Sequence, residues 1–233
     1  MIVTLIVFLA ILTQATVGFG LALISMPLLV AVLGIKTATP LVALIATAAE
    51  LVILGRYWRS IQFQSIKPLI ISSVIGIPLG VFILREVDAA IITPILGVVI
   101  LGYALYALFS PRLPRLVGRA WAYGFGFIGG ILGGAYNTSG PPVIVYGSCR
   151  RWPPDEFKGN LQGYFIPVTL LVLVVHGVSG NYTTAVWQNF LWAIPGIILG
   201  LIGGFFISGR LDPARFRKVV LILLLFLGLR LLF

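Results

Sequence analysis

The sequence predicts an all-α polytopic membrane protein made of two inverted-topology repeats, each a broken-helix hairpin plus three transmembrane helices. Hydrophobic residues make up 60% of the chain and charged residues only 9%, whereas a soluble domain carries about 25% charged residues. Apolar runs long enough to cross a bilayer, about 20 residues, recur between short charged loops. A membrane β-barrel would instead show alternating segments of about 10 residues.

Charged clusters divide the chain into single spans and two longer, broken stretches. Single spans are expected at 37–55, 68–84, 89–110, 159–177, 188–208 and 218–232. The stretches 1–33 and 120–147 are also apolar, but Gly and Pro interrupt both. Met1–Ala15 has no basic segment before its apolar run, so we expect it to be part of the fold rather than a signal peptide.

A sequence repeat relates the two halves. IGIPLGVFILREVD (75–88) resembles LGLIGGFFISGRLD (199–212). The pairs that match at one offset are Gln64 with Gln188, Gly76 with Gly200, Gly80 with Gly204, and Asp88 with Asp212. We therefore expect a first membrane repeat at 1–110, a cytoplasmic linker at 111–119 and a second repeat at 120–233.

Loop charges predict that the two repeats are inserted with opposite orientation. Loop 56–67 has three basic residues and its counterpart 178–187 has none, whereas loop 85–88 has one and its counterpart 209–218 has four. By the positive-inside rule, 56–67 and 209–218 face the cytoplasm and the other two loops face outside. Opposite insertion requires an odd number of crossings in each repeat.

Three ordinary spans in each repeat leave an even number of crossings for each broken stretch. A helical hairpin satisfies this, either as a re-entrant pair or as two short crossings. Loops 111–119 and 148–158 would then share the cytoplasmic side, and residues 34–38 would lie outside with Lys36.

The breaks in the two hairpins carry the functional prediction. They read VGFG (17–20) with SMP (25–27), and GGAYNTSGPP (133–142). Broken helices at bilayer depth occur inside protein or beside a water-filled cavity, and in inverted repeats they point to a transport site. We expect the tips of the hairpins to meet near the midplane.

The residue types at the breaks suit an anion. Helix N-termini offer backbone N–H groups and a partial positive charge, and Gly lets a ligand approach them. Neutral donors hold an anion without preventing its release, and prolines fit the first turn of a helix. The expected substrate-binding residues are Gly18, Phe19, Gly20, Ser25, Pro27, Asn137, Thr138, Ser139, Gly140, Pro141 and Gln162. The alternative is that Gly and Pro only permit close packing and a kink.

Other polar residues in the spans have two interpretations. Glu50 is the only acid inside an apolar run, and an intramembrane carboxylate is a candidate for proton coupling. It also lies about 9 Å of helix rise before Arg56, near enough to the interface to pair there. The uncharged residues Gln14, Asn160 and Gln162 either contact substrate or form interhelical hydrogen bonds.

Several residues are expected to serve the fold rather than the site. Glycines spaced by four allow close helix packing in lipid; they are Gly126, Gly130, Gly134, Gly196, Gly200 and Gly204. His176, at a predicted outer span end, is expected to have an interfacial rather than a coupling role. Tryptophans near span ends are typical of aromatic belts, and here they are Trp121, Trp152, Trp187 and Trp192.

Other function classes lack support. The chain has no HExxH, no Walker loop and no Ser/His/acid set that shares a site, so an enzyme is not expected. Cys149 is the only cysteine, and neither a cofactor nor a metal is expected. The net charge of +10 lies mostly in loops, where membrane topology places it, rather than indicating nucleic-acid binding.

Three motifs carry a family resemblance that covers nearly the whole chain. They are VGFGLALISMPLL (17–29), GGILGGAYNTSGPPVIVYG (129–147) and EFKGNLQGYF (156–165). With them the sequence resembles the TauE/SafE sulfite exporter-like permeases. The third motif is similar to that family's Phe-Arg-Gly-Thr-Leu-Gln-aromatic stretch, with Lys158 at the Arg and Asn160 at the Thr. The first Gly cluster is sparse here, and Tyr136–Ser139 replaces part of the second Gly-rich loop.

The resemblance implies transport of a sulfur-containing anion across the bacterial or archaeal cytoplasmic membrane. Sulfite, thiosulfate and organosulfonates such as sulfoacetate are the substrate class it implies. We expect alternating access, with export slightly favoured because an inside-negative potential drives a monovalent anion outward by about 2.3 kcal/mol per 100 mV. A passive anion channel and a non-transporting membrane partner subunit are the alternatives. The expected partners are the anion and the lipid bilayer, with a homodimer as one arrangement of the chain.

Overall fold

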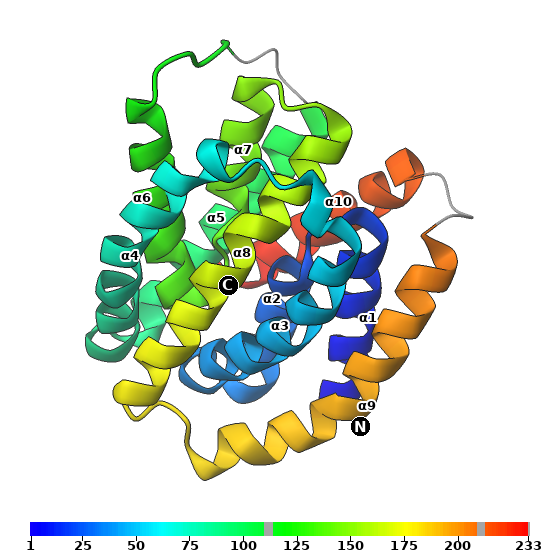
Figure 1. Cartoon of the computed structure of the whole chain (residues 1–233). Helices are drawn as coiled ribbons and strands as arrows, with labels where there is room; N and C mark the ends of the chain where they lie inside the picture. Colours follow the sequence, from blue (N-terminus) through cyan, green and yellow to red (C-terminus); the bar gives the residue numbers. More distant parts are fainter. Residues whose placement is uncertain (110–113, 209–212, 233) are drawn as a thin grey trace.

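The computed structural model describes residues 1–109, 114–208 and 213–232, which form a bundle of helices without a β-strand in those ranges (Figure 1). The α-helices are α1 (Ile2–Val17), α2 (Leu21–Leu33), α3 (Ile35–Tyr57), α4 (Phe63–Glu86), α5 (Ala89–Phe109), α6 (Ala120–Tyr136), α7 (Gly140–Arg150), α8 (Pro154–Val178), α9 (Thr184–Ile207) and α10 (Pro213–Arg230), with a 3₁₀ turn at Trp58–Ser60. Among them, α3, α4, α5, α8 and α9 are long and apolar enough to cross a membrane. The predicted all-α membrane fold is confirmed.

Each predicted single span falls on one helix, and most of these helices begin before the apolar run does. The span expected at 159–177, for example, belongs to α8, which begins at Pro154. The extra turn contains Asp155 and Glu156, and carboxylates at a helix N-terminus stabilise the helix dipole. The apolar run therefore identifies the buried part of a helix, while its polar ends extend the helix toward water.

The two broken stretches are helix pairs, as predicted. The first break, Gly18–Gly20, separates α1 from α2, and the second break, Asn137–Ser139, separates α6 from α7. With 13 and 11 residues, α2 and α7 rise about 20 Å and 17 Å, less than the hydrocarbon core of about 30 Å. These lengths favour the re-entrant form of the hairpins over two full crossings.

Left-handed backbone conformations end the first helix of each hairpin. Gly18 has φ 93° and Gly20 has φ 116° at the first break, and Asn137 has φ 51° at the second. Gly and Asn are the residues that adopt this region at least cost. The Gly18 N–H donates to the Gln14 carbonyl and the Asn137 N–H to the Gly133 carbonyl, so each helix closes on a residue suited to the turn.

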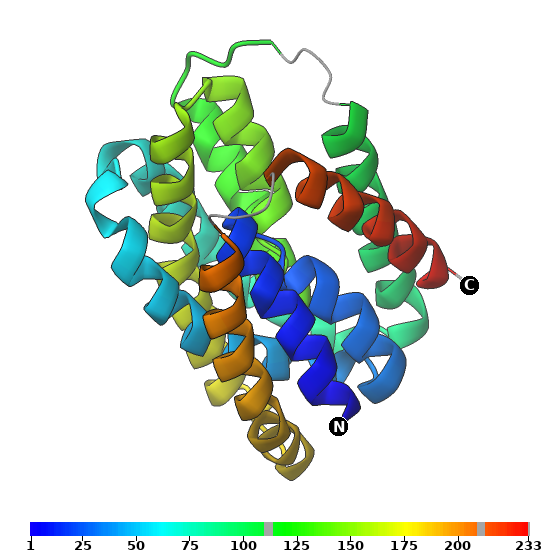
Figure 2. The same ribbon diagram turned by 90° about the vertical axis from the view of Figure 1, so that its right-hand side faces the viewer.

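Glycines form two close helix seams, α4 against α6 and α1 against α9. Figure 2 shows α1 and α9 side by side along their lengths. A Cβ added at Gly134 of α6 would lie 2.9 Å from the Val81 nitrogen of α4, and one at Gly204 of α9 would lie 3.0 Å from the Leu12 carbonyl oxygen of α1. The other glycines predicted to pack, Gly126, Gly130, Gly196 and Gly200, meet the facing helix equally closely. Their packing role is confirmed.

The two seams correspond to each other under the predicted repeat. That repeat places α1 opposite α6 and α4 opposite α9, so exchanging the halves turns one seam into the other. Likewise α5 packs against α10 and α3 against α8, each pair being one helix and its counterpart. This arrangement is consistent with two inverted repeats at 1–110 and 120–233, whose orientation in the membrane stays a prediction.

Contacts at both ends of the bundle agree with the predicted sidedness of the loops. Arg150 Nη1 donates to the carbonyls of Leu116 and Val117, both at 2.8 Å, which joins the predicted cytoplasmic regions 111–119 and 148–158. Lys36 Nζ donates to the Arg85 carbonyl at 3.1 Å and joins the two predicted outer regions. Arg112 of the linker 111–119 and Arg210 and Asp212 of loop 209–218 lie outside the described residues.

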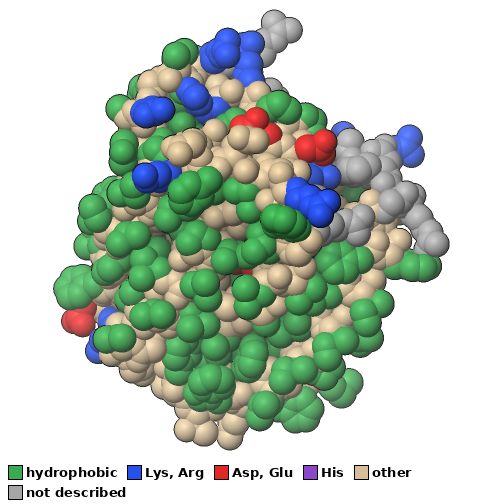
Figure 3. Space-filling view, in the orientation of Figure 1, with side chains coloured by type: hydrophobic (Ala, Val, Ile, Leu, Met, Phe, Trp, Pro, Cys, Tyr) green, Lys and Arg blue, Asp and Glu red, His purple; other side chains and the backbone are tan. Residues whose placement is uncertain are grey.

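The outer surface is apolar over most of the height of the bundle. In Figure 3 hydrophobic side chains cover the middle of the visible face, and Lys and Arg gather mostly toward one end. Trp121, Trp187 and Trp192 are exposed, as expected for aromatic belts. His176 is instead buried near the end of α8, with Nδ1 2.8 Å from Asn181 Nδ2, so its ring faces protein.

Candidate anion site

The two helix breaks meet at one small hollow, the central cavity, of about 30 Å³. Its lining residues are Gln14, Phe19, Gly20, Leu21, Ala22, Leu23, Ala46, Glu50, Asn137, Thr138, Ser139, Gly140, Pro141, Ile144, Phe165 and Thr169. This volume holds only a few waters and is smaller than typical ligand sites of about 300–1,000 Å³. Hairpins from opposite halves of the chain therefore share a narrow polar space.

The central cavity lies about halfway along the long helices. Phe165 and Thr169 line it from α8, which spans Pro154–Val178, and Ala46 and Glu50 line it from α3, which spans Ile35–Tyr57. These positions lie near the centres of helices that are long enough to cross a bilayer. The space is therefore near the depth at which the hairpin tips were expected to meet.

Two amide side chains hold the first break in place. Gln14 Oε1 accepts a hydrogen bond from the Leu21 N–H at 2.9 Å, and Gln162 Nε2 donates to the Gly18 carbonyl at 2.8 Å. Gln14 also lines the cavity, whereas Gln162 is not among its lining residues. Because Gln14 already accepts from Leu21, one N–H at the start of α2 is satisfied within the protein.

The second break presents side-chain donors to the cavity. The Asn137 amide and the Ser139 hydroxyl line the cavity and have no hydrogen-bond partner within the described ranges. Thr138 Oγ1 instead donates to the Tyr136 carbonyl at 2.8 Å. The predicted helix start is confirmed: α7 begins at Gly140, and Pro141 and Pro142 occupy its first turn. Since proline has no N–H, side chains supply most of the donors here.

Some predicted binding residues lie outside the cavity lining. Ser25 is fully buried in α2 and its hydroxyl donates to the Leu21 carbonyl at 2.8 Å, while Pro27 is buried further along the same helix. Gly18 contributes its carbonyl to Gln162 instead. Contact of these residues with an anion stays a prediction. Phe19, Gly20, Asn137, Thr138, Ser139, Gly140 and Pro141 do line the cavity.

Glu50 is one of the residues that line the central cavity. Its side chain is only 6% exposed, and its Oε2 atom is buried without a hydrogen-bond partner within the described ranges. Thr169 of α8 is near this carboxyl group and lines the same cavity. An acid with one unpaired oxygen beside an anion site is placed to exchange a proton with it, so the position fits the coupling role better than an interfacial one.

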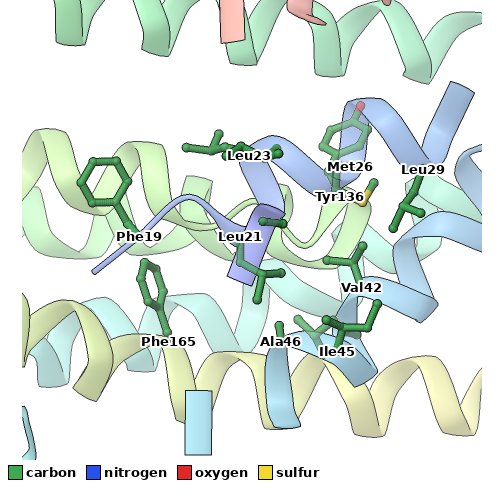
Figure 4. Packing of buried hydrophobic residues seen from close by; sticks show 14 of the residues in the cluster. Phe19, Leu21, Leu23, Met26, Leu29, Val42, Ile45, Ala46, Tyr136 and Phe165 are labelled. Atoms are coloured by element: carbon green, nitrogen blue, oxygen red, sulfur yellow. The ribbon is translucent and has the colours of Figure 1, made fainter. Parts of the chain in front are cut away.

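Apolar side chains form the rest of the wall. In Figure 4, Phe19 lies on the loop between α1 and α2, and the Phe165 ring points from α8 toward that loop. Leu21, Leu23 and Ile144 complete the apolar lining. Hydrogen bonds to an ion are stronger in such a low-dielectric surrounding, so a few neutral donors suffice to hold it.

Sequence reasoning missed two contributors from α8, Phe165 and Thr169. Phe165 ends the motif EFKGNLQGYF, and Thr169 follows it by four residues, which places both on one face of the helix. That spacing was available in the sequence, but a Thr in an apolar span is more often bonded to its own helix. Asn160 has a structural role: Oδ1 accepts from the Gln62 N–H at 2.8 Å and Nδ2 donates to Glu156 at 3.2 Å.

Comparisons with known proteins agree with this geometry. The sequence model of the family described as "Sulfite exporter TauE/SafE" matches residues 3–231. The chain is similar to "Probable sulfite/organosulfonate exporter TauE" from Cupriavidus necator, with 24% identity over 221 residues that cover 92% of this chain and 86% of the relative. No solved structure matches the chain.

Proposed function

Because the chain belongs to the TauE/SafE sulfite exporter family, we propose that it is a secondary transporter that carries sulfite, thiosulfate or an organosulfonate across the cytoplasmic membrane by alternating access. Family membership makes it a multi-span membrane transporter of sulfur anions rather than an enzyme. We propose, beyond family membership, these particular anions as substrates, alternating access as the mechanism, and a bacterial or archaeal inner membrane as the location.

One observation carries the proposal: the breaks of two hairpins from different halves share a buried polar cavity. Interrupted helices at matching positions of two repeats are the usual place for substrate in secondary transporters. Here the Asn137 amide and the Ser139 hydroxyl have no other partner within the described ranges. Both groups are therefore available to donate hydrogen bonds to an anion bound between them.

The chemistry of the cavity fits the group that these anions share. Sulfite, thiosulfate and sulfonates each present three oxygens on one sulfur, and these oxygens accept hydrogen bonds. Asn137, Ser139 and the start of α7 at Gly140 donate from one side, and the start of α2 faces them at Gly20. The rings of Phe19 and Phe165 offer an apolar surface to the carbon chain of a sulfonate.

The size of the cavity and the paired seams support the proposed alternating access. A space of about 30 Å³ must widen before it receives an SO₃ group, and widening toward one face at a time gives alternating access. The glycine seams α1–α9 and α4–α6 tie the first helix of each hairpin to the opposite repeat. We therefore assign the movement to these two seams as units, each of which contains helices from both repeats (1–110 and 120–233, joined by the linker at 111–119).

Flux measurements in proteoliposomes test this function. We expect the purified protein to carry sulfite and methanesulfonate with saturable kinetics, and we expect substrate on the far side to accelerate the flux, as in a carrier. Unitary conductance without such acceleration would indicate the passive channel instead. No flux of sulfite, thiosulfate, methanesulfonate or sulfoacetate would contradict transport and favour the partner subunit. Light scattering of the same preparation distinguishes a monomer from a homodimer.

A further inference from the structure

A second, larger hollow lies next to the central cavity on the predicted cytoplasmic side. This cytoplasmic vestibule has a volume of about 420 Å³. It is lined by Val17, Phe19, Ser148, Trp152, Pro154, Phe157, Lys158 and Arg217. Its walls are the end of α1, the end of α7 and the starts of α8 and α10. The volume falls within the range of small-molecule sites.

Among the described residues that line the vestibule, the charged side chains are Lys158 and Arg217, and both are positive. Arg217 is half-buried, and its guanidinium carbon lies 5.8 Å from the centroid of the Phe19 ring. The aliphatic part of Lys158 lies beside Gly18: a Cβ added at Gly18 would be 3.8 Å from Lys158 Cγ. Two cations in a hollow with aromatic walls attract an anion and offset the cost of its lost hydration.

Polar atoms beside Phe19 also have unused capacity for hydrogen bonds. The Arg217 Nε and the Tyr103 hydroxyl are buried and have no hydrogen-bond partner among the residues that the structure describes. The Tyr103 ring packs edge-on to the Phe19 ring, with centroids 6.3 Å apart. Because these two groups have no partner there, they can donate hydrogen bonds to an anion that passes the Phe19 ring.

Phe19 is the wall that the two spaces share. It lines both the central cavity and the vestibule, and its neighbours Gly18 and Gly20 have φ 93° and 116°. Glycine has backbone freedom that other residues lack, so the segment can reposition the ring. At the second break the residue between Asn137 and Ser139 is Thr138, so an aromatic wall is not required to form a break of this kind.

The repeat indicates that Arg217 is not needed to build its helix. Thr93 precedes Arg217 by the same offset that separates Asp88 from Asp212, so an uncharged residue fills the matching place in the first half. A half-buried cation carries a desolvation cost. Of the two matching positions, only the one in the second half, Arg217, carries a charge. This difference fits a residue that binds a ligand on one side of the membrane.

We propose that the cytoplasmic vestibule is a second anion site, in which Arg217 and Lys158 bind the sulfur anion and from which movement of Phe19 admits it to the central cavity. This site rests on the proposed transport function. It makes the cytoplasmic face the loading side, which is the order that export requires. Its ligand is a small organosulfonate or an inorganic sulfur oxyanion.

The test uses a cysteine at Ser148, which is exposed and lines the vestibule. In Cys149→Ser protein, which lacks the native cysteine, Ser148→Cys is modified from the cytoplasmic face by anionic sulfonatoethyl methanethiosulfonate or its cationic trimethylammonioethyl analogue. The measured quantity is the ratio of the anionic to the cationic reaction rate, after each rate is divided by the rate of the same reagent with a free thiol. We expect this ratio to be greater than one. Adding Arg217→Gln and Lys158→Gln is expected to lower that ratio about tenfold. The matched control is Arg151→Gln, which removes an exposed charge outside the lining and has a smaller effect.

Protection by ligand separates this site from the central one. Methanesulfonate is expected to slow modification at Ser148→Cys, and Asn137→Ala, which alters only the central cavity, is expected to leave that protection intact. A reagent ratio that the double variant does not change, or modification that methanesulfonate does not slow, would overturn the vestibule site. Loss of transport with both effects retained would instead count against the proposed function alone.

A second cysteine tests the role of Phe19. Ile144 lines the central cavity and is almost fully buried, so a cysteine there is expected to react slowly with the anionic reagent from the cytoplasmic face. Phe19→Ala joins the two spaces and is expected to raise that rate at least about tenfold, while Phe19→Leu, which keeps an apolar wall, raises it less. Equal rates in all three proteins would show that Phe19 does not separate the spaces.

Discussion

Replacing Glu50 with Gln is expected to abolish the pH dependence of sulfonate binding. Glu50 is the only titratable side chain among the residues that line the central cavity. When its carboxyl is ionised it repels the anion, and two like charges about 5 Å apart cost roughly 3 kcal/mol at an effective dielectric of 20. Wild-type affinity should therefore fall roughly 100-fold as rising pH removes the proton, because 1.4 kcal/mol is a factor of ten. The Glu50→Gln protein cannot ionise at this position and should keep high affinity throughout.

Isothermal titration with methanesulfonate at several pH values measures this effect. Methanesulfonate is chosen because its charge does not change over the pH range, unlike that of sulfite. Glu86→Gln, at the exposed end of α4, is the matched control and should retain the wild-type pH profile. The coupling role of Glu50 is wrong if wild-type binding does not depend on pH, or if Glu50→Gln keeps the full dependence.

Adding one methyl group to the seam between α4 and α6 is expected to destabilise the fold. In Gly134→Ala the new Cβ overlaps the Ile77 carbonyl oxygen and lies 2.9 Å from the Val81 nitrogen. These are backbone atoms of α4, so the helices must separate along the seam. We expect a loss of about 3 kcal/mol, at the upper end of the cost of overpacking. Thermal unfolding of the detergent-purified protein followed by tryptophan fluorescence measures it.

Gly124→Ala is the matched control on the same helix. No atom lies within 4 Å of a Cβ added at Gly124, and Ala has the higher helix propensity by about 1 kcal/mol. This variant is expected to be as stable as wild type or slightly more stable. Gly204→Ala, in the corresponding seam between α1 and α9, should behave like Gly134→Ala because its Cβ would contact Ala15 and Leu12. Equal melting temperatures for Gly134→Ala and Gly124→Ala would contradict the close packing of this seam.

The composition and the two breaks rich in glycine and proline were sufficient to predict the helices and the two hairpins. A chain with so few charges has few ways to satisfy its backbone in lipid other than helices, and glycine and proline identified both hairpins. The glycine seams were also predictable, since spacing by four places small residues on one face. The sequence could not show which helices these faces meet, because α4 contacts α6 and α1 contacts α9 across the two halves.

The polar residues of the candidate site were predictable, because a polar side chain is costly in lipid and is therefore conspicuous in an apolar sequence. Asn137, Ser139 and Glu50 are polar in an apolar chain, and all three line the cavity. Ser25 shares their polarity, but its hydroxyl is satisfied by the Leu21 carbonyl one turn earlier, a local bond that sequence does not reveal. Phe165 and Ile144 are ordinary apolar residues, and only the packing of α7 and α8 brings them to the cavity.

The most direct test of the central claim, that the meeting point of the two breaks binds a sulfur anion, is the affinity of the purified protein for methanesulfonate before and after Asn137→Ala and Ser139→Ala. A hydrogen bond to a charged group contributes about 1.5–3 kcal/mol, so each change is expected to weaken binding at least tenfold without lowering the melting temperature of the unliganded protein. Asn189→Ala, which removes an amide that donates to the Ala185 carbonyl near the start of α9 and lies outside the cavity lining, should bind like wild type. Wild-type affinity in both Asn137→Ala and Ser139→Ala would contradict the site.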